Sequence, residues 1–285
     1  MTAASLLQVS DLSIDFRTDA GVVPAVSGVS FEVGRGECLG IVGESGSGKS
    51  VSVSSLLGLL PRDTALRRSG TALFDGVDLY TLRSRELDRI RGNRIGMIFQ
   101  DPMSSFNPVT RIGTQVAEVI RTHDHRVTKR AALARVAELF DQVGIPDPAM
   151  RVRQYPHELS GGMRQRAMIA MAIANDPALI IADEPTTALD VTVQAQVLEL
   201  LRDLQRERDI SMILITHDLG VIAEMADRVV VMRGGCVVEE ADVFTLFEDP
   251  ASDYTRELLE CRPRMSSTER RLRGVGVPLA AEEER

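Results

Sequence analysis

The sequence contains no tryptophan and only three cysteines, Cys38, Cys236 and Cys261. These cysteines are far apart in the chain, and none of them belongs to a CxxC pair. Disulfide frameworks and zinc sites need more cysteines, or cysteines at closer spacing. We therefore expect neither feature, and we expect the chain to work in a reducing compartment.

Long apolar segments and an excess of positive charge are also missing. No window of about 18 residues is apolar and uncharged throughout, so no transmembrane helix is expected. The start, MTAASLLQVSDLSIDF, has no basic stretch followed by a long apolar one, which predicts no secretory signal peptide. Lys and Arg number 33 against 41 Asp and Glu, a net charge of −8. Such an acidic chain is a poor candidate for holding duplex nucleic acid, and we expect none among its partners.

Short apolar runs alternate with helical patterns, which predicts an α/β fold with a largely parallel sheet. The strands expected in this sheet are 38–42, 95–99, 178–182, 211–216 and 228–232. LQVSDLSIDF, AVSGVSFEV and TALFDGVDL alternate apolar and polar residues, as half-exposed antiparallel strands do. Residues from about 105 to 175 have mainly helical patterns, and 263–285 have the composition of a disordered tail.

The segment GESGSGKS matches the phosphate-binding pattern G-x-x-x-x-G-K-[ST]. It follows a predicted strand and precedes a helix that we expect Pro61 to end, which is the context that such a loop requires. Lys49 is expected to reach the β- and γ-phosphates of ATP, and Ser50 to ligate Mg²⁺. The predicted ATP-binding residues are Gly43, Glu44, Ser45, Gly46, Ser47, Gly48, Lys49, Ser50 and Val51.

Polar residues follow three other predicted strands. Asp183 and Glu184 end ALIIADE; we expect Asp183 to hold Mg²⁺ through a water and Glu184 to act as general base. His217 follows SMILIT and is expected to contact the γ-phosphate, because ligands gather at the carboxyl ends of parallel strands. Gln100 follows IGMIF, and its amide oxygen could ligate Mg²⁺ or orient water. Solvated acids at a strand end, a structural histidine and an ordinary loop glutamine are the alternatives.

Two features remain. Phe16 lies in the N-terminal strand region, where its ring could stack on adenine or could belong to the sheet face or the core. Ser160, Gly161 and Gly162 precede a helical run, and bare N–H groups at a helix N-terminus form an anion site. A capped helix explains Ser160 but not the two glycines, each of which disfavours helix by about 1 kcal/mol.

The motifs GESGSGKS, MIFQDP, LSGGMRQR, LIIADEP, ALD and ITHDL follow one another over about residues 6–260. In this order the chain resembles an ABC-transporter ATP-binding subunit, and the longer runs around these motifs resemble the oligopeptide/dipeptide/nickel importer branch. The resemblance implies a P-loop ABC ATPase domain at 1–262 with an N-terminal antiparallel β subdomain. It also implies an inserted α-helical subdomain at about 103–175.

The resemblance implies a Mg²⁺-dependent ATPase that powers import of peptides, with nickel or another metal chelate as the alternative cargo. Its implied partners are a related second ATPase, two membrane permeases and an extracytoplasmic solute-binding protein, at the cytoplasmic face of the membrane. A non-transport ABC ATPase, working on DNA, on the ribosome or in assembly, is the other alternative.

The resemblance also assigns roles to residues. It makes Glu184 the base, His217 the switch and Phe16 the adenine-stacking residue, and it gives Mg²⁺ to Ser50 and Gln100. Asp190 would bridge the two ATPase subunits. The signature loop that meets the partner's ATP would be Leu159, Ser160, Gly161, Gly162 and Met163.

Overall fold

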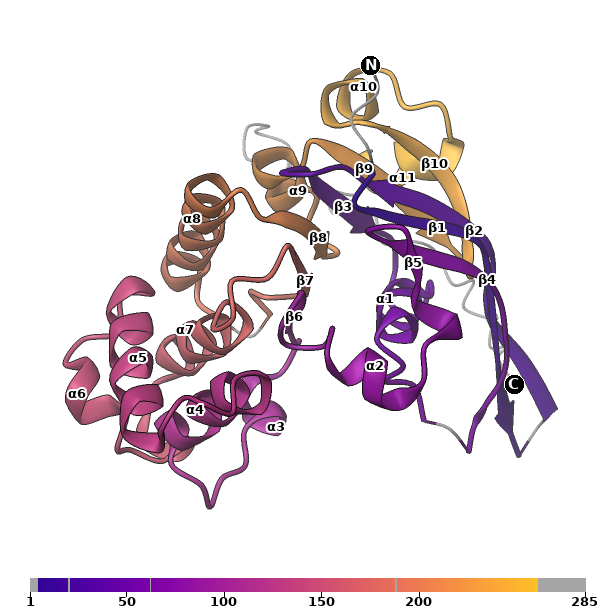
Figure 1. The fold of residues 1–285 in the computed structure, drawn as a ribbon. Coiled ribbons are helices and arrows are strands. Elements are labelled where there is room, and N and C mark those ends of the chain that lie inside the picture. Colours follow the sequence, from indigo (N-terminus) through magenta and orange to yellow (C-terminus); the bar gives the residue numbers. More distant parts are fainter. Residues whose placement is uncertain (1–4, 20, 62, 188, 261–285) are drawn as a thin grey trace, which may run out of the picture.

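The computed structural model describes residues 5–19, 21–61, 63–187 and 189–260. The predicted tail, 263–285, lies outside the described residues. The described residues form one six-stranded sheet in the order β10-β9-β3-β8-β7-β6 and one four-stranded sheet in the order β2-β1-β4-β5. Figure 1 shows the two sheets and the helices around them.

The six-stranded sheet confirms the predicted α/β fold. Its strands are β3 (Cys38–Val42), β6 (Ile95–Ile98), β7 (Leu179–Asp183), β8 (Ser211–Ile215), β9 (Arg228–Arg233) and β10 (Cys236–Asp242). Strands β9, β3, β8, β7 and β6 run parallel, and all five were predicted. Every residue of β3, β7 and β8 is buried, because the sheet is covered on both faces.

The four-stranded sheet is antiparallel, as predicted. It consists of β1 (Leu7–Thr18), β2 (Gly21–Val33), β4 (Ala65–Phe74) and β5 (Val77–Asp78). Strand β4 begins six residues before the predicted start at Thr71. Successive residues of β7 and β8 point to opposite faces of the large sheet and pack in two different hydrophobic clusters. Ile181 and Ile213 pack in the cluster with β1 and β2, whereas Ile180 and Met212 pack in the cluster with the helices.

Most of the helices surround the large sheet. Figure 1 shows α3, α4, α5 and α6 grouped around α7, apart from β1, β2 and β4. The helices are α1 (Lys49–Leu56), α2 (Ser84–Asp88), α3 (Pro102–Ser105), α4 (Ile112–His123), α5 (Lys129–Gln142), α6 (Pro148–Arg151), α7 (Gly161–Ala172), α8 (Val191–Arg208), α9 (Leu219–Met225), α10 (Val243–Glu248) and α11 (Asp253–Glu260). Short 3₁₀ turns occupy Leu79–Thr81 and Pro156–Glu158.

The prediction that Pro61 ends the first helix was wrong. Helix α1 ends at Leu56, and Gly58 just beyond it has a φ of 57°. A glycine in the left-handed conformation commonly ends a helix, because it carries no Cβ to oppose that geometry. Gly58 therefore stops α1 before the proline is reached.

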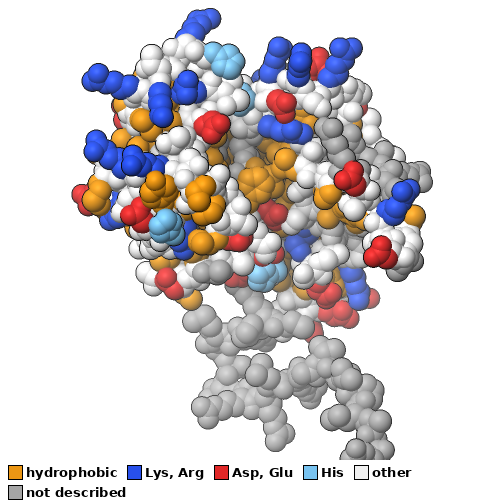
Figure 2. Space-filling model, turned by 90° about the horizontal axis from the view of Figure 1, so that it is seen from below, with side chains coloured by type: hydrophobic (Ala, Val, Ile, Leu, Met, Phe, Trp, Pro, Cys, Tyr) orange, Lys and Arg blue, Asp and Glu red, His pale blue; other side chains and the backbone are white. Residues whose placement is uncertain are grey.

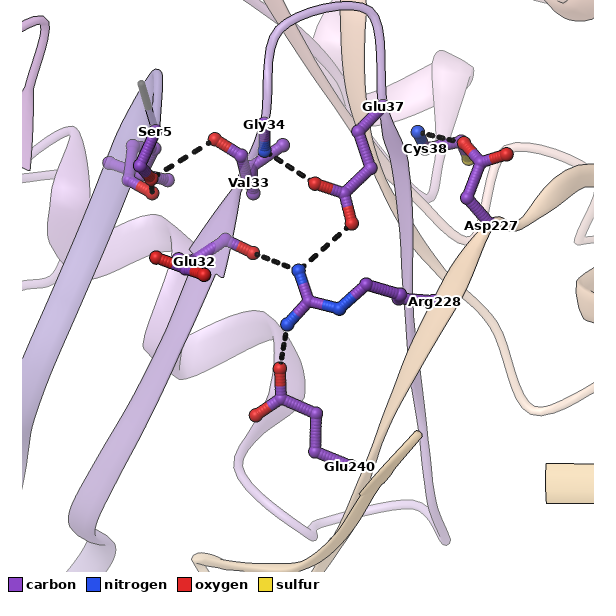
Figure 3. Close-up of polar contacts among 10 residues, drawn as sticks. Ser5, Glu32, Val33, Gly34, Glu37, Cys38, Asp227, Arg228 and Glu240 are labelled. Carbon is purple, nitrogen blue, oxygen red and sulfur yellow. Dashed lines mark hydrogen bonds and ion pairs between the residues drawn. The ribbon is translucent and has the colours of Figure 1, made fainter. Parts of the chain in front are cut away.

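An ionic cluster fixes the turn between β2 and β3, as Figure 3 shows. The Arg228 guanidinium donates to Glu37 Oε1 (3.0 Å) and to Glu240, and it lies 3.5 Å from the Glu32 carbonyl. Beside it, the backbone N–H of Cys38 donates to Asp227 Oδ2 (2.8 Å). These contacts join the two sheets where β3 begins.

Strand β6 packs so closely on α7 that residue 96 has no room for a side chain. A Cβ on Gly96 would lie 2.4 Å from the carbonyl oxygen of Ala172. Because this neighbour is backbone, Gly96→Ala should cost about 1–3 kcal/mol of unfolding free energy. Denaturant unfolding measures it, with Gly161→Ala as the control, since a Cβ there meets nothing closer than 4.0 Å. Equal stability of the two variants would contradict this packing.

Candidate functional site

The loop from Gly43 to Ser50 joins β3 to α1, in the position predicted for a phosphate-binding loop. Gly43, Gly46 and Gly48 have φ values of 148°, 81° and 98°. A Cβ on Gly43 would lie 2.1 Å from the carbonyl oxygen of Met232, and one on Gly48 would lie 2.7 Å from that of Ala25. The glycines at these two positions are therefore required by both conformation and space.

Two side chains of the loop are held by polar contacts. Lys49 is buried, and its Nζ donates to the carbonyl oxygens of Gly43 (2.6 Å) and Glu44 (2.8 Å). Burial lowers the pKa of Lys49, against the opposing effect of nearby carboxylates. The Ser50 hydroxyl donates to Asp183 Oδ1 (2.8 Å). Two residues predicted to hold Mg²⁺ thus touch each other across 133 positions of sequence.

Lys49 and Ser50 border a cleft of about 250 Å³, whereas Gly43, Glu44 and Asp183 are not among its lining residues in the described part of the chain. The lining consists of Ala25, Ser45, Gly46, Ser47, Gly48, Lys49, Ser50, Val51, Gln100 and Glu184. Phe16 is not part of this lining in the portion of the chain that the structure describes. It pairs with Val23 and Ala65 and packs, partly buried, against the hydrophobic core, which is the alternative that the sequence left open.

Glu184 is where the predicted polar residues meet. Its φ of 47° is unusual for a residue with a side chain, and its N–H donates to the carbonyl of Ile215 (2.9 Å). Its Oε2 accepts from Gln100 Nε2 (3.0 Å) and from Thr187 Oγ1 (2.8 Å), and its Oε1 lies 3.5 Å from His217 Nδ1. Sequence reasoning missed Thr187, because its contact depends on the turn that follows Glu184.

The buried Asp183 carboxyl makes a prediction about stability. Burial raises its pKa, and the negative charge of Glu184 adds to this effect. The hydrogen bond from Ser50 and the positive charge of Lys49 act in the opposite direction and are outweighed. A carboxyl whose pKa is higher in the folded state binds protons more readily there. The folded state therefore loses stability as pH rises from about 3.9, the unfolded value, through the raised folded value.

Asp183→Asn removes this cost at neutral pH. We expect its thermal unfolding midpoint at pH 7 to exceed that of the wild type by a few degrees, because ~1 kcal/mol corresponds to about 2–4 °C in a chain of this size. The gap should shrink as the pH approaches about 4. Thermal unfolding at several pH values, with Asp203→Asn on the exposed side of α8 as control, measures it. A lower midpoint for Asp183→Asn at pH 7 would contradict the argument.

The signature loop forms the start of α7. Ser160 is the N-cap, and its Oγ accepts from the N–H of Met163 (3.2 Å), while Leu159 is buried. A Cβ on Gly162 would lie 2.8 Å from Val193 Cγ1 on α8, whereas one on Gly161 would meet nothing closer than Leu189 Cδ2, at 4.0 Å. Close packing of α7 on α8 therefore accounts for Gly162, which corrects the expectation that helix capping leaves both glycines unexplained. These residues do not line the cleft around Lys49 within the described ranges.

Asp190 caps the next helix. Its Oδ1 accepts from the N–H of Val193 (3.0 Å) at the start of α8, and the neighbouring Val191 is 85% exposed. Asp190 thus has a local structural role in addition to the predicted bridging role. Across the described residues, no helix is long and apolar enough to cross a bilayer, and no cluster of three or more His, Cys, Asp or Glu side chains is placed to hold a metal.

Comparison with known proteins matches the ABC transporter family model to residues 26–187. The chain is 53% identical to the oligopeptide transport ATP-binding protein OppD of Bacillus subtilis, over 92% of this chain and 73% of that protein. It is 52% identical to a putative peptide import ATP-binding protein of Brucella melitensis, over 92% of this chain and 79% of that one. A dimeric ATP-binding cassette in a post-hydrolysis state, bound to ADP and Pi, superposes with a TM-score of 0.74 at 26% identity. That alignment covers 83% of this chain and 98% of the cassette.

Proposed function

Because this chain belongs to the ABC transporter family of ATP-binding subunits, we propose that it is the ATPase of a membrane importer for peptides. The observation that carries the cargo class is the high identity, over nearly the whole chain, to relatives named for oligopeptide and peptide transport. The cleft around Lys49 and Glu184 supports the ATPase chemistry, because it combines a phosphate-binding loop with a carboxylate at its rim.

Lys49, Ser50 and Asp183 prepare the nucleotide in this proposal. Lys49 turns from the carbonyls of its own loop toward the phosphates. Ser50 and Asp183 offer a hydroxyl and a carboxylate oxygen, the hard donors that suit Mg²⁺ at nucleotide sites, where one or two protein ligands suffice. Mg²⁺, when bound, neutralises charge on the phosphate oxygens. Gln100 lies at the same rim and is the third candidate ligand.

Glu184 acts as general base. It removes a proton from the attacking water as the water oxygen bonds to the γ-phosphorus and the bond to the bridging oxygen of ADP breaks. Thr187 and Gln100 donate to the same carboxylate oxygen and so orient it, while the other oxygen faces His217. His217, whose side chain is 67% exposed, would report whether the γ-phosphate is present.

The second half of the site comes from another ATPase subunit. Ser160 and Gly161 lie at an exposed helix start outside the Lys49 cleft, so they are available to a nucleotide held by a partner. ATP would then close two subunits and hydrolysis would reopen them, because the closed pair binds ATP more tightly than the open pair does. Family resemblance favours a related chain as this partner over a second copy.

Exposed apolar side chains support docking to further subunits. Met103 and Val109, near α3, are 53% and 80% exposed. Figure 2 shows hydrophobic side chains around a hollow on the face seen from below, with basic side chains mainly toward its edges. Apolar patches of this kind commonly mark interaction surfaces. We assign this face to two membrane permeases, which would hold the chain at the cytoplasmic side of the membrane and receive peptide from a solute-binding protein.

Uptake by cells that lack this chain tests the cargo. Loss of uptake of labelled di- and oligopeptides, with normal nickel uptake and restoration by the intact gene, is the expected result. Loss of nickel uptake alone would replace peptide by a metal chelate. Normal uptake of both, together with co-purification of ribosomes or nucleic acid, would remove the importer assignment.

A further inference from the structure

Helix α11 touches the phosphate-binding loop through one side chain. Tyr254, which is 5% exposed, accepts a hydrogen bond on its hydroxyl from the backbone N–H of Glu44 (3.2 Å). The carbonyl of Glu44 in turn accepts from Lys49 Nζ (2.8 Å) and from the N–H of Ser47 (3.1 Å). One residue of the loop is thus held from inside by Lys49 and from outside by a residue 210 positions later.

Tyr254 is itself fixed in place. The Arg233 guanidinium, at the end of β9, lies over its ring at 4.5 Å from the ring centre. Just before α11, the two carboxylate oxygens of Glu239 accept from the N–H groups of Ala251 (2.7 Å) and Ser252 (3.0 Å). These contacts set the start of α11 and the ring, so the hydroxyl reaches Glu44 from a rigid support.

A second contact from the same part of the chain holds the other side of the loop. In the turn between β9 and β10, the N–H of Gly235 donates to the carbonyl of Ser47 (3.1 Å), and its carbonyl accepts from Ser27 (2.8 Å). Gly235 has a φ of 83°, and a Cβ there would lie 2.8 Å from the Ala25 carbonyl. Residues 233–255 therefore hold the phosphate-binding loop at two backbone groups, the N–H of Glu44 and the carbonyl of Ser47.

We propose that Tyr254 is a positioning residue for nucleotide binding, whose hydroxyl holds the Glu44 peptide in the phosphate-binding geometry before ATP arrives. This inference rests on the assignment of the Gly43–Ser50 loop as the ATP site under the proposed function. Nothing in it requires Tyr254 to touch the nucleotide.

Loss of the Tyr254 hydroxyl should weaken ATP binding, because Lys49 holds the loop only until it turns to the phosphates. When Lys49 turns toward the phosphates, its contacts with the carbonyls of Gly43 and Glu44 are weakened. The Tyr254 contact still holds the peptide between Gly43 and Glu44, through the Glu44 N–H. Without the hydroxyl, the free loop samples other orientations, and the apparent dissociation constant rises by the inverse of the competent fraction. Once ATP is bound, the phosphates order the loop, so turnover at saturation is unaffected.

Tyr254→Phe tests the inference, because it removes the hydroxyl and keeps the ring under Arg233. In the full chain, titration with a non-hydrolysable ATP analogue and Mg²⁺ should show binding weakened about fivefold, as for a competent fraction of about one fifth. In the assembled transporter, KM for ATP should rise by a similar factor, with kcat within about twofold of wild type. Tyr80→Phe is the matched control, since that hydroxyl bonds Ser55 on α1 (2.8 Å) instead of the loop.

Each outcome decides. Unchanged analogue binding and unchanged KM in Tyr254→Phe would overturn the inference. A lowered unfolding midpoint in the same variant would then show that Tyr254 serves stability. Lowered kcat at constant KM would also overturn the inference. If Tyr254→Phe does not fold, Arg233→Met is the second variant, because it removes the guanidinium over the Tyr254 ring. We expect a smaller rise in KM for ATP, and an unchanged KM would overturn the inference. Lys49→Ala separates the two claims: if that variant binds the analogue as well as wild type does, the proposed ATP site itself is wrong.

Discussion

Glu184→Gln is expected to abolish most ATP turnover and to leave ATP binding intact. Glutamine has nearly the same shape and still accepts from Thr187 and Gln100, but it cannot take a proton from water at neutral pH. General-base catalysis contributes about 10²–10⁴-fold, and we expect kcat to fall by that factor. Binding depends on the loop around Lys49, which this change leaves untouched.

The measurement is steady-state ATPase activity of the assembled complex, together with ATP-analogue binding by the full chain. Glu224→Gln is the control, because that carboxylate pairs with Arg202 on the surface (2.7 Å) and should leave both quantities unchanged. Near-normal hydrolysis by Glu184→Gln would remove Glu184 as the base. Loss of binding and turnover together would show that the carboxylate serves nucleotide affinity instead.

Ser160→Arg should stop hydrolysis in the assembled complex while the isolated chain still binds ATP. The arginine would fill the exposed start of α7, where we place the γ-phosphate held by the partner subunit. Lys49→Ala should differ in its effect on ATP binding. It removes the phosphate contact within the chain and so weakens binding by the isolated chain. We expect each change to lower turnover by at least about a hundredfold, the scale of losing an electrostatic transition-state contact.

Helix capping must be separated from this effect. Ser160→Ala also loses the hydrogen bond to Met163, which costs about 0.5–2 kcal/mol of stability, but it leaves room for the phosphate. Its turnover should therefore exceed that of Ser160→Arg clearly at equal folded fraction. If Ser160→Arg abolishes ATP binding by the isolated chain, the signature loop serves its own nucleotide and the two-subunit site is wrong.

Sequence patterns were sufficient for the centre of the fold. The parallel strands are continuous apolar runs, and such runs need burial on both faces, as β7 and β8 show. Strand β10 was missed because CVVEEAD carries three acids and has an exposed or half-exposed residue at every position. Among the described strands it pairs only with β9, so it lies at the edge of the sheet and does not need a continuous apolar run.

The candidate site was predictable in its parts and less so in its contacts. Gln100, Glu184 and His217 each follow a parallel strand, and the carboxyl ends of such strands lie at one edge of the sheet. The structure shows that both Gln100 and His217 lie beside Glu184. The donation by Thr187 depends on the local turn at Glu184, with its φ of 47°, which no pattern specified. The contact between Tyr254 and Glu44 joins segments with no shared pattern, so only the tertiary structure reveals it.

The central claim is that this chain powers peptide import from a site completed by a second subunit. The most direct test is ATP hydrolysis by the complex purified from membranes through a tag on this chain. We predict that the complex contains a second ATPase and two polytopic subunits, and that peptide-loaded binding protein raises its hydrolysis rate. A fully active monomer, with hydrolysis independent of chain concentration and of added peptide and binding protein, would contradict the claim.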